Sequence, residues 1–398
     1  MPPHHTIDTL SIALYVPRIM RVQSSATAAV GYAAAPPIGA IFAPRDQGPW
    51  LFGRSLDLAV FGGSAVLSFA LLGLGAATGM LHGDVPPWLW LACIVAVDVA
   101  HVWSTMFRVY LDGREVRRRP LLYLGVPVLC YVIGAAAHAV SAMTFWRLLA
   151  YAAVFHFVRQ QYGWVALYRR RAGERGRFDR VLDTAVIYAA TVYPLIWWHG
   201  HLPRSFYWFM HNDFVTGLAD AVARPLAYVY WGLLAAFLIR QGVLAATGHT
   251  INAGKVLVVL TTWACWYVGI IAFDSDYAFT VTNVLIHGIP YLALTYRYGR
   301  ARAAQQPNSL LGRILNGGVA AFVFFCLVAA FAEEALWDQY IWHDNEHIFG
   351  EGVNFAGWMI TLLVPFLALP QAVHYVLDGF IWKVRRGNPT LRKELSDS

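Results

Sequence analysis

The chain has 398 residues, of which 58% are hydrophobic and only 13% are charged. An ordinary soluble domain carries about 25% charged residues, so this composition excludes a soluble globular protein and indicates an integral membrane protein. The formal net charge is +7, but no aromatic and basic groove or binding motif accompanies it, so we expect no nucleic-acid partner.

Repeated apolar stretches of about 20 residues predict an all-α, polytopic transmembrane helical bundle with about ten spans. In chain order the expected spans are 56–79, 87–110, 120–140, 143–168, 181–201, 222–247, 254–273, 277–298, 313–333 and 354–383. Residues 1–50 show little periodicity, so we expect a flexible or membrane-surface segment before the bundle of residues 51–386. Residues 387–398 are expected to form a cytoplasmic tail.

Basic residues collect in the loops after every even-numbered span, as in 117–119, 169–171 and 385–386. The intervening loops carry Asp and Glu and are poor in Lys and Arg. By the positive-inside rule, the basic loops and both termini are cytoplasmic. We therefore expect an integral protein of a bacterial inner (plasma) membrane, in contact with the lipid bilayer.

Four histidines lie in four separate apolar segments, each with a polar partner one helical turn away. The pairs are Asp98/His101, His156/Gln160, Asn283/His287 and His374/Asp378. Spacings of three or four residues put both members on one helix face. A single such histidine is most simply explained as a tie between two helices. Four pairs, each at roughly 10 to 20 Å from the expected inner boundary, favour one shared functional site.

The residue types in these pairs predict a metal site. We expect His101, His156, His287 and His374 to bind the metal, because neutral imidazole is a common metal ligand. Asp98 and Asp378 are candidates for further ligands, catalytic bases or partners that orient the rings. The remaining candidates for the surrounding shell are Gln160, Asn283 and Tyr291. Arg159 is a further candidate catalytic residue that could hold a substrate carboxylate or phosphate. The alternatives are a salt bridge to Asp98 or Asp378, or a side chain that snorkels toward the membrane surface.

Ligand chemistry narrows the metal only in part. Several imidazoles without a thiolate suit iron, zinc or copper, whereas magnesium and calcium prefer oxygen-rich sites. Non-haem iron is the first choice, because a metal among apolar helices is well placed to meet dioxygen and a lipid-soluble substrate. Hydrolytic zinc is the alternative.

At class level, the scattered histidines resemble those of the integral-membrane histidine-site oxygenases. That class includes the fatty-acid desaturases and hydroxylases and the bacterial carotenoid-cleaving Brp/Blh proteins. Clustered HxxxH and HxxHH boxes are absent around the four histidines, and one histidine per helix is similar to the Brp/Blh arrangement. The resemblance implies a metal-dependent oxidoreductase or oxygenase acting on a lipid or isoprenoid, with an electron donor protein as a possible partner.

Other functions fit parts of the same pattern. A proton-coupled transporter would also place His, Asp, Asn and Arg inside helices, and a b-type haem protein could use histidines as axial ligands. If the protein had a purely structural role, the four pairs would have to be accidental. His343 and His347 form a rival metal candidate, although an acidic solvated loop is the simpler interpretation of their segment.

Overall fold

The structure is a computed structural model that describes residues 40–44, 48–217, 220–344, 346–384, 388 and 391. The chain divides into residues 1–35 and residues 36–398, and the description below concerns the second unit. All regular structure among the described residues is helical, which confirms the all-α bundle predicted from the sequence.

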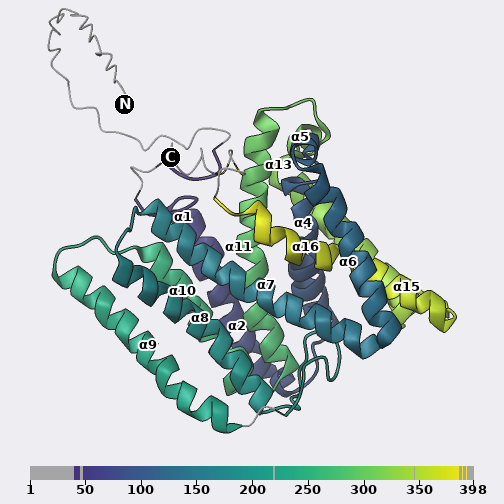
Figure 1. The fold of residues 1–398 in the computed structure, drawn as a ribbon, viewed down its shortest axis with the longest axis horizontal. Helices are drawn as coiled ribbons and strands as arrows, with labels where there is room; N and C mark the ends of the chain where they lie inside the picture. Colours follow the sequence, from purple (N-terminus) through teal and green to yellow (C-terminus); the bar gives the residue numbers. More distant parts are fainter. Residues whose placement is uncertain are drawn as a thin grey trace, which may run out of the picture. The chain divides into compact units, whose positions relative to one another are not determined.

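Ten long helical stretches form the bundle (Figure 1). The first five comprise α1 (Arg54–Asp57), η2 (Leu58–Gly63) and α2 (Ser64–Thr78); α3 (Pro87–Leu89), η4 (Trp90–Val99) and α4 (Ala100–Arg108); α6 (Pro120–Val140); α7 (Ala142–Arg171); and α8 (Arg177–Gly200). The other five comprise α9 (Asp220–Ala246); α10 (Ala253–Trp266) and η5 (Tyr267–Ala272); α11 (Asp276–Ala304); α13 (Gly318–Trp337) and η6 (Asp338–Trp342); and α15 (Gly357–Leu367) with α16 (Leu369–Ile381). The short helices are η3 (Met80–His82), α5 (Gly113–Arg118), α12 (Leu310–Leu315) and α14 (Glu346–Phe349).

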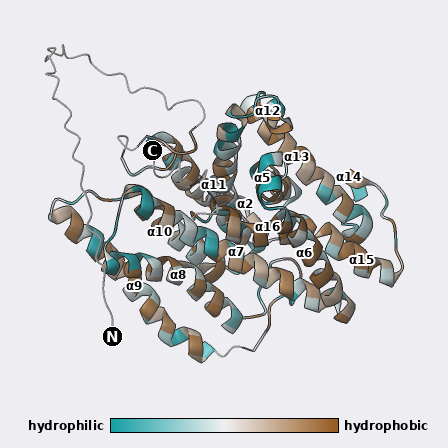
Figure 2. Cartoon of the chain, turned by 45° about the horizontal axis from the view of Figure 1, so that its top comes forward, coloured by the Kyte–Doolittle hydropathy of each residue, from teal (hydrophilic) through white to brown (hydrophobic). Residues whose placement is uncertain are grey.

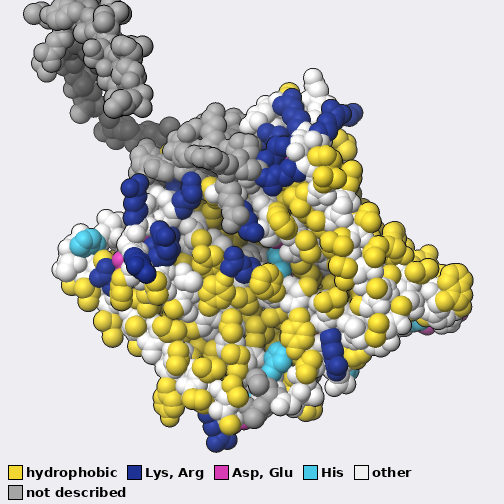
Figure 3. Space-filling view, in the orientation of Figure 1, with side chains coloured by type: hydrophobic (Ala, Val, Ile, Leu, Met, Phe, Trp, Pro, Cys, Tyr) yellow, Lys and Arg dark blue, Asp and Glu magenta, His cyan; other side chains and the backbone are white. Residues whose placement is uncertain are grey.

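Nine of these stretches are long and apolar enough to cross a membrane, which supports an integral membrane protein. The tenth, α7, is 30 residues long, but it carries too many polar side chains to meet the same hydropathy criterion. Hydrophobic residues predominate along the helices (Figure 2), and apolar side chains cover much of the surface in the space-filling view (Figure 3). Leu121 is 91% exposed and Val140 is 78% exposed. Such surfaces are stable in contact with lipid rather than with water.

Local sequence signals explain where several helices begin. Ser141 caps α7 by accepting a hydrogen bond from the Thr144 amide, and Ser275 caps α11 in the same way from the Ala278 amide. A hydroxyl at this position satisfies a backbone donor that the first helical turn leaves unpaired. The helical path is interrupted beside Pro370, where α15 ends and α16 begins. Pro127, Pro194 and Pro290 lie within continuous helices.

α11 is the central helix of the bundle, and it packs against α2, η4, α4, α10 and α12 (Figure 1). α16 packs against α4, α6 and α7. The helices α4, α7, α11 and α16 are those on which the sequence places the four candidate histidines. Helix packing therefore brings the four histidine-bearing segments to the middle of the bundle.

Basic side chains gather at one end of the bundle, the upper end in Figure 3. Buried ion pairs hold the helices together there: Lys255 Nζ lies 2.9 Å from Asp183 Oδ2 and 2.7 Å from Glu174 Oε2, and Arg169 also contacts Asp183. These contacts join α7, α8 and α10. The grouping agrees with the alternation of basic and acidic loops in the sequence, while the assignment of this end to the cytoplasm stays a prediction.

The expected N-terminal segment, residues 1–50, lies mostly outside the described residues. Its last part is packed rather than flexible, because Ile41 and Phe42 are fully buried. The Arg297 guanidinium on α11 donates to the carbonyls of Ala40 and Ile41 at 3.0 and 2.6 Å. The packed structure therefore begins at or before residue 40 and not at residue 51. Most of the expected tail, residues 387–398, also lies outside the described residues.

Candidate metal centre

Four histidines from four helices meet at one buried point. They are His101 on α4, His156 on α7, His287 on α11 and His374 on α16, and none is more than 3% exposed. The Nε2 atoms of His101 and His287 are 3.1 Å apart, and those of His156 and His374 are also 3.1 Å apart. One ring nitrogen from each histidine lies within 4.8 Å of the other three. The structure thus brings together the four histidines that the sequence singled out.

Irregular backbone positions two of these helices. His101 follows directly after η4, a run of wide π-type turns of the kind often found at functional sites. His374 lies on α16, whose direction is set by the break at Ala368. Close approach of α11 to η4 depends on Gly288, because a Cβ atom there would lie 2.6 Å from Val97 Cγ1. That contact brings His287 next to His101.

A chain of hydrogen bonds fixes the ring of His374. Tyr291 donates its hydroxyl proton to Asp378 Oδ1 at 2.6 Å, so it can only accept from Thr105, whose Oγ1 lies 3.2 Å away. The Thr105 hydroxyl then has no proton left for His374 Nδ1, which lies 2.8 Å from it. This chain of donors favours the His374 tautomer that carries its proton on Nδ1 and donates it to Thr105. The Nε2 lone pair consequently faces the other histidines, as a metal ligand requires.

Asp378 lies behind two of the four rings. Its Oδ2 is 3.6 Å from His156 Nδ1, and its Oδ1 is 3.9 Å from His374 Nδ1. The Asp378 side chain is 9% exposed. Trp382 supports the arrangement by donating to the Tyr291 hydroxyl at 3.3 Å. In this position the Asp378 carboxylate lies on the Nδ1 side of both rings, where it could orient them.

Asp98 is placed differently from Asp378. Its Oδ1 lies 3.5 Å from His101 Nδ1, and its side chain is 34% exposed. It approaches one ring instead of two. Both carboxylates lie on the Nδ1 side of their histidines, so the structure favours the ring-orienting role for them among the roles expected from the sequence.

Aromatic rings close the cluster on further sides. The Phe157 ring stacks on the His287 imidazole with centroids 3.5 Å apart and an interplanar angle of 8°. Tyr375 lies against His156 at a centroid distance of 5.1 Å. Such walls exclude water and strengthen electrostatic interactions inside the site.

The two candidate amides contact the backbone and not the imidazoles. Gln160 donates to the main-chain carbonyl of His287 at 2.9 Å. Asn283 donates to the carbonyl of Phe279 at 3.0 Å. Both amides therefore lie near the site, as expected. Gln160 bonds to a neighbouring helix, and Asn283 bonds within its own helix. Neither amide fixes a histidine tautomer.

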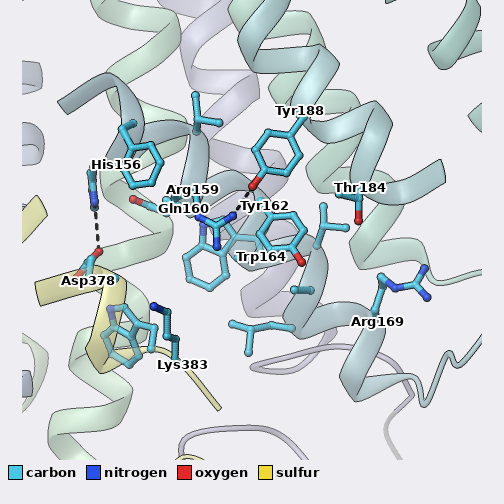
Figure 4. Close-up of a pocket in the computed structure, with 18 of the residues that line it drawn as sticks. His156, Arg159, Gln160, Tyr162, Trp164, Arg169, Thr184, Tyr188, Asp378 and Lys383 are labelled. Carbon is cyan, nitrogen blue, oxygen red and sulfur yellow. Dashed lines mark hydrogen bonds and ion pairs between the residues drawn. The ribbon is translucent and has the colours of Figure 1, made fainter. Parts of the chain in front are cut away.

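Arg159 forms neither of the salt bridges considered from the sequence. Its guanidinium donates to the Tyr188 hydroxyl and lies over the Tyr162 ring, 4.8 Å from the centroid. No carboxylate pairs with it among the described residues. Figure 4 shows Arg159 in a pocket between the His156–Asp378 pair and Tyr188.

That pocket is a cavity of about 1330 Å³ that reaches the histidine cluster from one side. His156, Tyr291, Tyr375 and Asp378 line its inner part. A second cavity, of about 190 Å³, reaches His374 and Thr105 and is otherwise lined mainly by apolar side chains such as Val102 and Val373. The histidine cluster therefore borders two separate cavities.

The rival histidine pair at the far end of the bundle forms no comparable cluster. His343 adopts a left-handed conformation with φ of 57° between η6 and α14, so it does not share a helix face with His347. Among the described residues, the only group of three or more potential metal ligands with converging atoms is the four-histidine cluster.

Several residues of the site escaped sequence reasoning. Phe157 and Tyr375 directly follow His156 and His374, and aromatic neighbours of this kind are a signal that could have been noted. Trp382 and Tyr188 could not have been found, because their contacts depend on how separate helices pack.

Comparisons with known proteins add no family to these observations. No family model, curated protein or solved structure matches the chain. Its function therefore has to be argued from the site.

Proposed function

We propose that this protein is a membrane-embedded, metal-dependent oxidoreductase, with non-haem iron bound by His101, His156, His287 and His374. The observation that carries the proposal is the convergence of four imidazole Nε2 atoms beside a large cavity within a bundle of apolar helices. The expected location is a bacterial plasma membrane.

The four residues fit a metal ion. Metal–imidazole bonds of about 2.0–2.1 Å separate neighbouring nitrogens of a tetrahedral site by roughly 3.3 Å. The His101–His287 and His156–His374 separations are both 3.1 Å, and all four nitrogens lie within 4.8 Å of one another. The tautomer of His374 also supports binding, because its Nε2 is free of a proton. A tie between two helices needs only one pair of imidazoles, whereas two pairs from four helices meet here at one point.

The ligand set favours a transition metal. Imidazole without thiolate suits iron, zinc or copper, and the carboxylates of Asp98 and Asp378 lie behind the rings. Iron, when bound, would supply the activation of dioxygen. The chain's own residues hold and orient the imidazoles, exclude water through Phe157 and Tyr375, and keep a protonated hydroxyl chain at Tyr291 and Thr105.

The two cavities support a reaction between a large apolar molecule and a small one. The cavity of about 1330 Å³ can hold a lipid or isoprenoid chain, and the apolar cavity of about 190 Å³ can admit dioxygen, which dissolves well in membranes. In a mono-oxygenation, a C–H bond becomes C–OH while the second oxygen atom leaves as water. Two electrons and two protons must then come from an electron donor protein.

The alternatives are less well supported. A bis-histidine haem requires a porphyrin ring between its axial ligands, and four ring nitrogens within 4.8 Å of one another leave no room for one. Alternating access in a transporter requires one group of helices to move against another, whereas the histidine contacts here join α4 to α11 and α7 to α16. The spacing of the four ring nitrogens therefore favours a metal ion without a porphyrin over a haem.

The test is elemental analysis together with an optical spectrum of the full chain purified in detergent. Wild-type protein is compared with His101→Ala, His374→Ala and the control His138→Ala, which removes a histidine on α6 outside the cluster. We expect stoichiometric iron without a Soret band in the wild type and the control, and loss of iron in both cluster variants.

Two results would overturn the proposal. Folded wild-type protein that takes up no transition metal on reconstitution would remove the metal centre. Equal metal loss in His138→Ala would show that the loss reflects general damage to the bundle.

A further inference from the structure

We propose that the large cavity binds an amphiphile with an anionic headgroup, a carboxylate or a phosphate, and that Arg159 holds this headgroup next to the histidine cluster. The inference rests on the proposed function, because it names the substrate class for that centre. It is carried by the position and the partners of Arg159.

Arg159 lies in the middle part of α7, its side chain is exposed to the cavity, and no acid pairs with it among the described residues. It is twelve residues from the end of the helix at Arg171, which corresponds to roughly 18 Å along the axis. Its partners are the neutral Tyr188 hydroxyl and the Tyr162 ring. A cation at such depth is costly unless it finds an opposite charge. An anionic ligand in the cavity would supply that charge.

Two carboxylates line the same cavity, and both are already engaged: Glu174 pairs with Lys255 and Arg169. Asp378 accepts from Tyr291 and faces the two imidazoles of His156 and His374. It also lies beyond salt-bridge distance of Arg159, since no ion pair joins the two. The Arg159 guanidinium therefore remains available for bidentate binding of a carboxylate or phosphate.

The headgroup position decides which part of the ligand meets the metal cluster. Arg159 follows His156 by three residues, so the two side chains share one face of α7, with a separation of roughly 4.5 Å along the axis. Both line the cavity (Figure 4). The carbon atoms presented to His156 and Asp378 are consequently those close to the headgroup.

The rest of the cavity suits the other parts of an amphiphile. Val154, Phe155, Val192 and Leu195 line it on the side away from the basic end, where an apolar chain can lie. At the basic end it is lined by cations that have no acidic partner among the described residues, namely Arg170, Arg175, Arg180 and Lys383. These charges would attract an anionic amphiphile to the entrance.

The experiment measures equilibrium binding of radiolabelled hexadecanoate to the full chain in nanodiscs of zwitterionic phosphatidylcholine. Competitors are hexadecyl phosphate, hexadecanol and inorganic phosphate. The variants are Arg159→Gln, the charge-retaining Arg159→Lys, and the control Arg147→Gln, which removes another arginine of α7 that bonds the Asn212 carbonyl outside the cavity. Metal content and gel-filtration behaviour are recorded for each.

We expect hexadecyl phosphate to compete with hexadecanoate, and hexadecanol to compete at least ten-fold less well. Loss of a charge-assisted hydrogen bond predicts about a ten- to hundred-fold weaker affinity in Arg159→Gln, with most of the affinity kept in Arg159→Lys and all of it in Arg147→Gln. Equal binding of the alcohol, or unchanged anion preference in Arg159→Gln, would overturn the inference. Competition by inorganic phosphate equal to that by hexadecyl phosphate would also overturn it, because the ligand would then be a soluble anion.

Metal content separates this inference from the proposed function. Metal-free protein that still prefers the anionic amphiphile through Arg159 would refute the oxidoreductase and leave the binding site. Metal-loaded protein without that preference would refute the binding site and leave the metal centre.

Discussion

Replacement of Asp378 by Asn tests whether the carboxylate behind the rings supports metal binding. Asp378 lies 3.6 Å from His156 Nδ1 and 3.9 Å from His374 Nδ1, and it accepts the proton of Tyr291 that sets the His374 tautomer. The Asn side chain has nearly the same shape but carries no charge. The substitution therefore removes the electrostatic support of two ligands at once.

The expected loss follows from this geometry. Removing a partner that orients a metal ligand typically lowers metal affinity by 10- to 100-fold, or about 1.4–2.8 kcal/mol. Because Asp378 supports two rings and is nearly buried, we expect the upper part of this range. Asp98→Asn is the matched control: that carboxylate faces one ring at 3.5 Å and is 34% exposed, so we expect the lower part.

The assay is competition for the metal between purified protein and a chelator of known affinity, with thermal unfolding in detergent measured in parallel. An equal loss of metal affinity in Asp98→Asn and Asp378→Asn would contradict the idea that a carboxylate near two rings matters more than one near a single ring. Unchanged affinity in Asp378→Asn would refute the ring-orienting role itself.

Two further predictions concern the walls of the site and the basic end of the bundle. Phe157→Ala removes the ring that stacks on His287 and should destabilise the protein by roughly 3 kcal/mol. The control Phe155→Ala, at a position that is 66% exposed, should have little effect. Equal shifts of the unfolding temperature in the two variants would contradict this prediction. Burial raises the pKa of the Glu115 carboxyl, but Arg118, Arg108 and Tyr123 outweigh it and lower that pKa from 4.5 to about 2. The charged form is therefore stabilised by folding, and its contribution of about 3 kcal/mol is full at neutral pH and is lost as the pH falls from 4.5 toward 2. Glu115→Gln should lower the unfolding temperature at pH 7 and flatten its decline in acid, and an unchanged acid decline would count against the linkage.

Hydropathy and spacing predicted a large part of the architecture because membrane burial constrains sequence strongly. Ten expected spans match ten long helices, with boundaries such as 143–168 for the observed Ala142–Arg171. The break at Ala368 was harder to place, because Pro365 and Pro370 are equally good candidates and only packing of α16 against α4 and α7 decides between them. The packing of residues 40–43 was missed, since short irregular segments carry no periodic signal.

The candidate site also has one part that the sequence could predict and one part that it could not. Each histidine could be chosen from its own helix, because a buried imidazole and a polar partner one turn away form a local pattern. Which helices are neighbours is not local information, so the pairing of His101 with His287 and of His156 with His374 required the fold. The same limit applies to Asp378, which follows His374 in sequence but lies nearer to His156 on another helix.

α7 shows how function and membrane insertion conflict in this chain. Among the long helices of the described structure, it is the one that fails the hydropathy criterion for a span, yet it carries His156 and Arg159. Its polar side chains do not face lipid without partners: Gln160 bonds the His287 carbonyl, and Gln161 accepts from Thr262 at 3.0 Å. A helix that lines a cavity must carry polar groups that a lipid-facing helix would exclude. The weakest span signal in the sequence therefore marks the helix that contributes most to the cavity.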